Sequence, residues 1–141
     1  MLAEPIDAPS KTSPAELLGA YESDLADVVE TVGVERAHEA TGLDRSVLES
    51  VEGGDAADLE VDDAAAILAL QDGAPATDAI LAEVRDHLLL GMSSAMLTVE
   101  HIAADVDGNL DPKEIQGMVE GRHPMSLAQF ARINHYIAGA Q

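Results

Sequence analysis

The sequence contains no cysteine and no tryptophan, and aromatic residues of all kinds make up only 2% of it. The absence of cysteine excludes disulfide bonds, thiolate metal ligands and cysteine nucleophiles. Residues of the hydrophobic set nevertheless make up 47% of the chain. Because small aliphatic residues supply most of this apolar content, closely packed helices are favoured over sheets. We therefore expect an all-α protein.

Basic residues are also scarce. Seven lysines and arginines stand against 27 aspartates and glutamates, which gives a formal net charge of -20 at pH 7. Such an excess repels itself and any polyanion at ordinary ionic strength. In molar salt the Debye length falls to about 3 Å, so the repulsion is screened. The excess of acidic over basic residues indicates a protein from the cytoplasm of a salt-accumulating cell. The alternative is an acidic protein that works at low salt.

Two segments lack features that would suggest export or membrane insertion. The start of the chain, MLAEPIDAPSKTSP, has neither the basic beginning nor the apolar run of a signal peptide. We expect a disordered lead-in over residues 1–12. Residues 87–99, HLLLGMSSAMLTV, carry no acidic or basic residue except His87. This segment is shorter than the roughly 20 residues that cross a bilayer, so it predicts a buried helix between two halves of the molecule or at a dimer interface.

Helix start and stop signals divide the rest of the chain into eight expected helices. Ser13-Pro14-Ala15-Glu16 is a capping box with proline at the first helical position, and Gly33 ends the helix that follows. Asp44, Asp111 and Ser126 are further expected caps. The expected helices span 14–32, 34–41, 45–52 and about 60–71, then about 78–95 and three more that begin near 99, 112 and 127.

The order of helices within residues 13–73 recurs within residues 77–139: long, short, short, medium. Apolar and turn residues of the two segments pair at offsets of 65 to 67 positions. The pairs are Val34 with Val99, Leu43 with Leu110, Leu48 with Ile115, Val51 with Met118, Gly54 with Gly121, Val61 with Leu127 and Ile67 with Ile133. This spacing predicts two tandem four-helix repeats packed into one compact unit.

The stretch VERAHEATGLDRSVLESVEGGDAADLEVDDAAAILAL resembles the phage-repressor-like helix-turn-helix class. In that class TGLDRSVL would form the turn and the start of the recognition helix, and DAAAILAL a supporting helix. Residues 14–138 also resemble a small, acidic haloarchaeal family of unknown function, most distinctively in KEIQGMVEGRHPMSLAQFARINHYIA. The first resemblance implies two degenerate helix-turn-helix repeats, and the second implies a haloarchaeal cytoplasm without implying an activity.

The helix-turn-helix resemblance identifies residues that would meet a DNA groove. In the first repeat they include Arg45, Ser46 and Glu49. Base edges are read mostly by arginine or lysine on guanine and by asparagine or glutamine on adenine. One arginine beside Asp44 and Glu49 fits this chemistry poorly. The first repeat is therefore not expected to read DNA.

The second repeat carries a more suitable set. Lys113, Gln116, Arg122 and His123 lie on or just after its third helix. Gln116 could bind adenine, while Lys113 and Arg122 could meet phosphates. The structural alternative, which we favour, is that Lys113 pairs along its helix, Arg122 caps the helix end and His123 is an ordinary loop residue.

Metal and catalytic motifs are incomplete. DVDGNLDPKE, residues 105–114, alternates acidic and amide residues like a calcium loop. Leu110 stands where that loop requires glycine, however, and Gln116 where it requires a bidentate glutamate. The histidine pairs that could share a metal, His101 with Asp105, His38 with Glu35 and His87 with Glu83, fall short of the three or four ligands of a zinc site. We expect no enzyme, no metal and no cofactor.

We therefore predict a non-catalytic cytoplasmic module that works by associating with another protein or with itself. The candidate contact residues are Lys113, Gln116, Arg122, His123 and Tyr136 of the second repeat. Tyrosine is enriched at protein interfaces, and Tyr136 lies in the late helix that also holds Phe130 and His135. The alternative function is a DNA-binding transcriptional regulator that reads through the second repeat. No membrane partner is expected.

Overall fold

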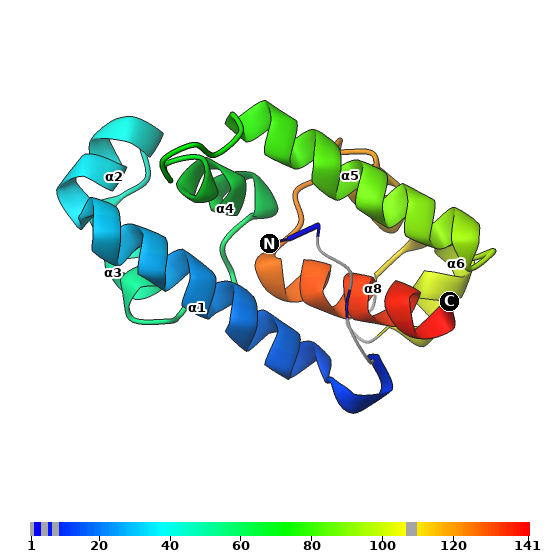
Figure 1. Cartoon of the computed structure of the whole chain (residues 1–141). Coiled ribbons are helices and arrows are strands. Elements are labelled where there is room, and N and C mark those ends of the chain that lie inside the picture. Colours follow the sequence, from blue (N-terminus) through cyan, green and yellow to red (C-terminus); the bar gives the residue numbers. More distant parts are fainter. Residues whose placement is uncertain (1, 4–5, 7–8, 107–109) are drawn as a thin grey trace.

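The structure is a computed structural model that describes residues 2–3, 6, 9–106 and 110–141. Within these residues it contains eight α-helices, a short 3-10 turn and no strand, which confirms the expected all-α class (Figure 1). The elements are η1 (Pro9–Lys11), α1 (Pro14–Val32), α2 (Val34–Thr41), α3 (Arg45–Glu52), α4 (Val61–Leu68), α5 (Thr77–Ser94), α6 (Val99–Asp105), α7 (Pro112–Val119) and α8 (Leu127–Ala140).

The helix boundaries follow local signals that were visible in the sequence. Ser13 Oγ accepts a hydrogen bond from the amide of Glu16 at 3.1 Å, and Ser126 and Gln129 complete a reciprocal capping box at the start of α8. Asp111 Oδ1 accepts a bond from the amide of Lys113 at 2.9 Å. Asp44 precedes α3, but its side chain makes no capping bond among the described residues.

The helix α4 is shorter than expected. It ends at Leu68, whereas the sequence predicts a helix to about residue 71. Beyond Leu68 the chain tightens into turns, because the amides of Leu70 and Gln71 bond to the carbonyls of Ile67 and Leu68, three residues back. With this end, α4 has eight residues, the same length as α2 and α3.

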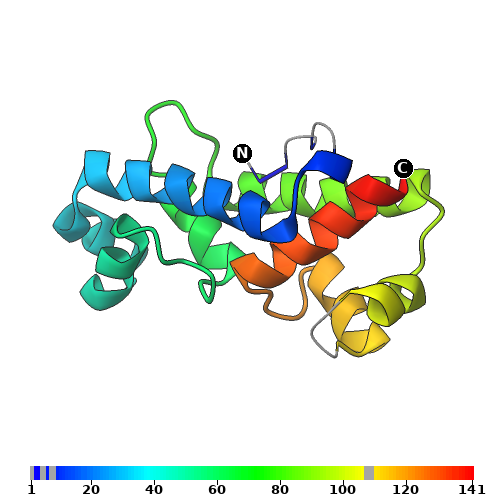
Figure 2. The same ribbon diagram turned by 90° about the horizontal axis from the view of Figure 1, so that it is seen from below.

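The helices form an elongated molecule. Figure 2 shows α2 and α3 at one end and α6 and α7 at the other, with α1, α5 and α8 running between them. We refer to residues 13–73 as the first half and to residues 77–139 as the second half. The long first helix of each half packs against the last helix of the other: α1 lies against α8, and α5 lies against α4.

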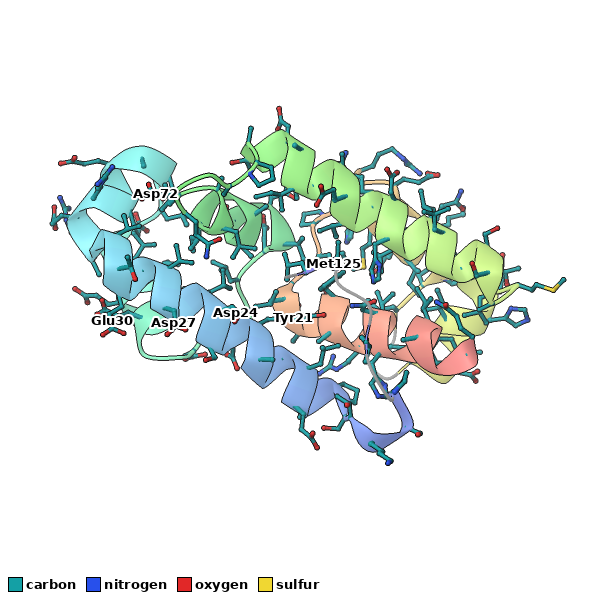
Figure 3. The ribbon with its side chains drawn as sticks, in the orientation of Figure 1. Tyr21, Asp24, Asp27, Glu30, Asp72 and Met125 are labelled. Carbon is teal, nitrogen blue, oxygen red and sulfur yellow. The ribbon has the colours of Figure 1, made fainter. Side chains whose placement is uncertain are left out.

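Acidic side chains are prominent along the outer surface of the first half. Asp24, Asp27 and Glu30 follow one another on α1 at intervals of three residues, and Asp72 lies just after α4 (Figure 3). Residues three apart lie on neighbouring positions of a helix surface. This spacing therefore concentrates negative charge along one side of α1.

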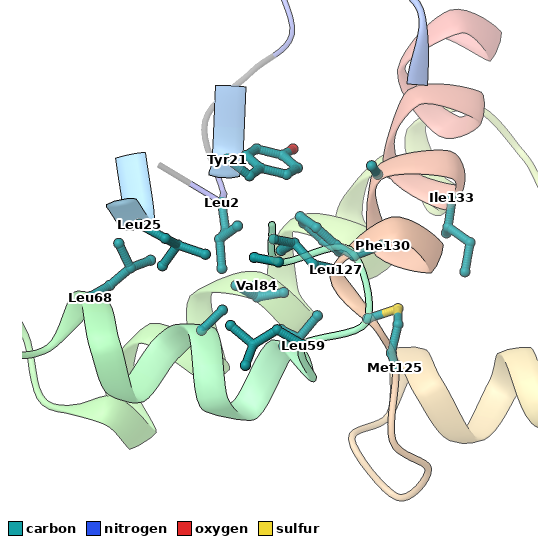
Figure 4. Close-up of a cluster of buried hydrophobic side chains, with 14 of the residues drawn as sticks. Leu2, Tyr21, Leu25, Leu59, Leu68, Val84, Met125, Leu127, Phe130 and Ile133 are labelled. Atoms are coloured by element: carbon teal, nitrogen blue, oxygen red, sulfur yellow. The ribbon is translucent and has the colours of Figure 1, made fainter. Parts of the chain in front are cut away.

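The core is continuous between the two halves. The rings of Tyr21 of α1 and Phe130 of α8 have centroids 5.6 Å apart, and Leu25 of α1 belongs to the same buried cluster (Figure 4). Such aromatic pairs stabilise by about 0.5–1.5 kcal/mol beyond the area that they bury. Because these residues come from both halves, neither half buries its apolar face alone.

Two reciprocal backbone hydrogen bonds join the halves at the centre of the molecule, beside a third from the amide of Ala128 to the carbonyl of Ala57 at 3.0 Å. The amide of Val61 donates to the carbonyl of Met125 at 2.8 Å, and the amide of Leu127 donates to the carbonyl of Leu59 at 2.7 Å. These bonds form an isolated antiparallel bridge between Glu60 and Ser126. The residues just before α4 and just before α8 are thereby fixed to each other.

The uncharged segment 87–99 is buried on one face only. Leu88, Gly91 and Met92 lie in the core. Leu89, Leu90 and Met96 are exposed, with 43%, 67% and 86% of their surface accessible. The expectation of a buried helix therefore holds for the side of α5 that meets the core, whereas Leu89 and Leu90 on α5 and Met96 beyond its end are open to solvent. No helix among the described residues is both long and apolar enough to span a bilayer.

Some described residues of segment 1–12, for which the sequence predicts a disordered lead-in, contact the helices. Leu2 is buried in the core with 3% of its surface accessible. His135 of α8 places Nε2 3.0 Å from the carbonyl oxygen of Pro9 and also within hydrogen-bonding distance of that of Thr12. Leu2 and the hydrogen bonds of His135 thus connect described parts of this segment to the helices, and hydrophobic periodicity does not reveal these contacts.

Candidate functional site

The expected contact residues of the second half begin on an exposed side of α7. Lys113 and Gln116 are exposed, and Glu120 follows α7 on the same side. Gln116 Nε2 donates to one carboxylate oxygen of Glu120 at 3.3 Å, and Arg122 Nη2 donates to the other at 2.6 Å. The hydrogen bond from Arg122, followed by that from Gln116, lowers the pKa of Glu120. Two of the groups that would read DNA are therefore engaged by one carboxylate.

The first half, where the sequence predicts counterparts of these residues, shows the same kind of pairing. Arg45 at the start of α3 donates to both carboxylate oxygens of Glu35 on α2, from Nε at 2.5 Å and from Nη2 at 3.1 Å. The hydrogen bond from Arg45 lowers the pKa of Glu35. Ser46 and Glu49 are exposed. The outer side of α3 thus presents an arginine whose fork is already occupied.

Arg122 and His123 lie in the loop between α7 and α8, and the fold places Arg85 of α5 beside them. The three side chains line a cleft of about 220 Å³, which we call the Arg85 cleft. Its other lining residues are Glu60, Val61, Asp62, Leu81, Val84, Leu88, Met118, Gly121, Pro124 and Met125. Sequence reasoning missed Arg85, because nothing local links it to a loop more than 30 residues later.

Two glycines allow this loop to pack closely. Gly121 has a φ of +79°, and a Cβ atom there would come within 2.2 Å of Nε of Arg85. A Cβ atom on Gly117 would come within 2.9 Å of the Cβ atom of His123. Glycine adopts positive φ without the steric cost of other residues. These glycines therefore position Arg85 against the backbone at residue 121 and His123 against α7.

Tyr136 does not share this surface. Its hydroxyl group donates a 2.6 Å hydrogen bond to Asp105 of α6. Both residues line a separate groove of about 580 Å³ together with the start of α1 and with Arg132 and His135 of α8. The hydrogen bond to Asp105, followed by burial, raises the pKa of Tyr136. The expected contact residues are therefore divided between two places.

The histidines considered as metal ligands have other partners. His101 Nδ1 accepts a hydrogen bond from the amide of Thr98 at 3.1 Å, which completes a capping box for α6. His38 Nδ1 lies 2.6 Å from the carbonyl oxygen of Leu43. His87 Nε2 lies 2.8 Å from Oδ1 of Asn134. No group of three or more histidine, aspartate or glutamate side chains is arranged to hold a metal in the described part of the chain. Asp107 and Asn109 of the calcium-like motif lie outside it.

Comparisons with known proteins identify a family for this chain but no activity. No curated protein and no solved structure matches the chain. A family model does match, over residues 17–140, which is nearly the whole sequence. The chain belongs to this family, DUF5791, a family of unknown function.

Proposed function

We propose that the protein is a non-catalytic module, derived from duplicated helix-turn-helix units, that acts in a haloarchaeal cytoplasm by associating with another protein or with itself. The observation that carries this proposal is the pairing of the groove-facing side chains. Arg45 is held by Glu35, and Gln116 and Arg122 are held by Glu120. In both halves a carboxylate of the same unit accepts hydrogen bonds from side chains that nucleic acid would need, whereas the side chain of Lys113 is not among those held.

The reciprocal bonds at the centre of the molecule support the duplication. Residue 61 donates to residue 125, and residue 127 donates to residue 59. The donors, residues 61 and 127, are 66 positions apart in the sequence, and so are the acceptors, residues 59 and 125. The two bonds are therefore related by the same offset that relates the two halves. The helix contacts are reciprocal in the same way, because α1 of the first half packs against α8 of the second and α5 of the second half packs against α4 of the first. Isologous contacts of this kind are expected when two copies of one unit pair about a two-fold axis.

Association with protein is further supported by the exposed apolar side of α5. Leu89, Leu90 and Met96 lie on a stretch without a charged residue, in a chain that carries 27 acidic ones. Interface cores are depleted of charged residues relative to the rest of a protein surface. The end of α5 and the turn that follows it therefore offer a partner exposed apolar side chains in a stretch without charged residues.

The proposal is tested by three assays in molar potassium chloride. We expect a filter assay with genomic DNA fragments to show no sequence-dependent retention, and a pull-down to recover a stoichiometric protein partner or light scattering to show a dimer. Leu90→Ser should weaken any association through α5, whereas Ala79→Ser, on an exposed position of the same helix, should not. Saturable DNA retention that is lost in Lys113→Glu and Gln116→Ala would instead establish a DNA-binding regulator.

A further inference from the structure

We propose that the Arg85 cleft binds a single carboxylate side chain of a partner protein, with Arg85 as its counter-ion. This inference rests on the proposed role in protein association and specifies the chemistry of the partner. The partner would present one exposed glutamate or aspartate at its interface. The inference is carried by the position of Arg85, the size of the cleft and the charges at its rim.

Arg85 is an arginine held in place without a counter-ion. It is half-buried on α5, and its guanidinium group lies against the backbone of Gly121. It makes no hydrogen bond or ion pair within the ranges that the structure describes, although the chain has 27 acidic residues. A guanidinium group presents parallel N–H donors that match the two oxygens of a carboxylate. Arg85 is therefore preorganised to receive such a group.

The size of the cleft favours one side chain over a free small molecule. Its volume of about 220 Å³ lies below the roughly 300–1,000 Å³ that is typical of small-molecule sites. Met118 and Met125, both buried, are among its apolar lining residues. Methionine side chains adapt readily to the shape of a neighbouring group. The methylene groups of a glutamate could pack there while its carboxylate meets Arg85.

The charges at the rim favour a single negative charge over a polyanion. Glu60 and Asp62 also line the cleft, and Arg122 is already paired with Glu120. His123 adds positive charge only when it is protonated. A phosphate group with about two negative charges, or a nucleic acid, would be repelled by the two carboxylates more strongly than a lone carboxylate. The charges of the lining therefore disfavour a polyanion more than a lone carboxylate, and the attraction for that carboxylate comes from Arg85.

The test uses nuclear magnetic resonance of the full-length, ¹⁵N-labelled protein. The Nε–Hε signal of Arg85 and the amide signals of Gly121 and His123 are followed during titration with the blocked tripeptide acetyl-Ala-Glu-Ala-amide. The control probes are the peptide with glutamine in place of glutamate and inorganic phosphate. We expect saturable shifts with the glutamate peptide, and binding at least about 10-fold weaker with the other two probes.

Two variants identify the residue responsible. Arg85→Gln should weaken binding of the glutamate peptide at least about 10-fold. Arg36→Gln, which changes an exposed arginine of α2 outside the cleft, should leave it unchanged. Circular dichroism confirms that both variants are folded. The inference is overturned if the glutamate peptide gives no saturable shift, if the glutamine peptide or phosphate binds as tightly, or if Arg85→Gln binds like the parent.

A pull-down separates this inference from the proposed function. If the parent chain and Arg85→Gln recover the same protein partner in equal amounts, protein association stands and the cleft is not its anchor. If the glutamate peptide binds in the cleft but the chain recovers no partner and does not self-associate, the site stands and the proposed function is wrong.

Discussion

The contact between Tyr136 and Asp105 shows how one carboxylate acts at the scale of a residue. The phenol of Tyr136 donates to Asp105 at 2.6 Å. Deprotonation would remove this donor and place two negative charges side by side, so the pKa of Tyr136 is raised above its ordinary value. The same chain uses Glu35 and Glu120 to hold cationic donors. The carboxylate of Asp105 favours the neutral form of Tyr136, and those of Glu35 and Glu120 engage N–H groups of neighbouring arginines.

We predict that Asp105→Asn lowers the pKa of Tyr136 toward the ordinary value of about 10. A folded pKa above the unfolded one means that the interaction stabilises the fold fully below the unfolded pKa and is lost as pH rises through the folded pKa. The parent protein should therefore lose more stability than the variant across that alkaline range. Ring signals of the two tyrosines, assigned with Tyr136→Phe, provide the measurement. Identical titration of Tyr136 in parent and variant would contradict the prediction.

At the scale of the element, glycines within long helices have opposite roles. Gly19 is exposed on α1, and a Cβ atom there would have no neighbour within 4 Å among the described atoms. Gly91 is buried on α5, and a Cβ atom there would lie 2.7 Å from Cγ2 of Ile137 on α8. Ile137 is itself buried, with 2% of its surface accessible. The glycine of α5 therefore permits two helices to approach closely, and the glycine of α1 does not serve that purpose.

We predict that Gly19→Ala stabilises the protein by about 0.5–1 kcal/mol, because alanine reduces the conformational freedom of the unfolded chain. Gly91→Ala should destabilise it by about 1–3 kcal/mol, because the added methyl group overpacks the contact between α5 and α8. Urea unfolding followed by circular dichroism measures both free energies of unfolding. Equal stabilisation in the two variants would show that α5 and α8 do not approach as closely as described.

At the scale of the whole molecule, charge opposes compaction. The net charge of -20 is gathered into a molecule whose two halves share one core. The Debye length shortens from about 10 Å at 0.1 M salt to about 3 Å at 1 M. Mutual repulsion of carboxylates several ångströms apart should therefore be relieved over this range.

We predict that the Tm rises on the order of 5 °C between 0.1 and 1 M potassium chloride, equivalent to about 1 kcal/mol. The double variant Asp27→Asn and Glu30→Gln, which removes two exposed charges from α1, should show a smaller rise. Thermal melts in potassium chloride and in sodium chloride check that ionic strength, and not one cation, is responsible. A Tm independent of salt would refute the role of repulsion.

Most of the helices could be located without the structure because their signals are local. The capping residues Ser13 and Ser126 and the stop at Gly33 act within a few positions along the chain, and the structure places helix ends beside them. Segments whose ends depend on packing were located less well. The helix α4 gives way to turns after Leu68, and residue 2 lies in the core although no periodic pattern surrounds it.

Composition and periodicity alone determined the all-α class, the eight helices and the anionic surface, because side chains a few residues apart govern caps and faces. Tertiary packing decided which distant residues meet. It brought Arg85 to the loop at residues 121–123, placed Tyr136 with Asp105 in another groove and left Leu90 in solvent. These outcomes depend on how whole helices cross, and helix crossing is set by the complete set of apolar faces and not by any single segment.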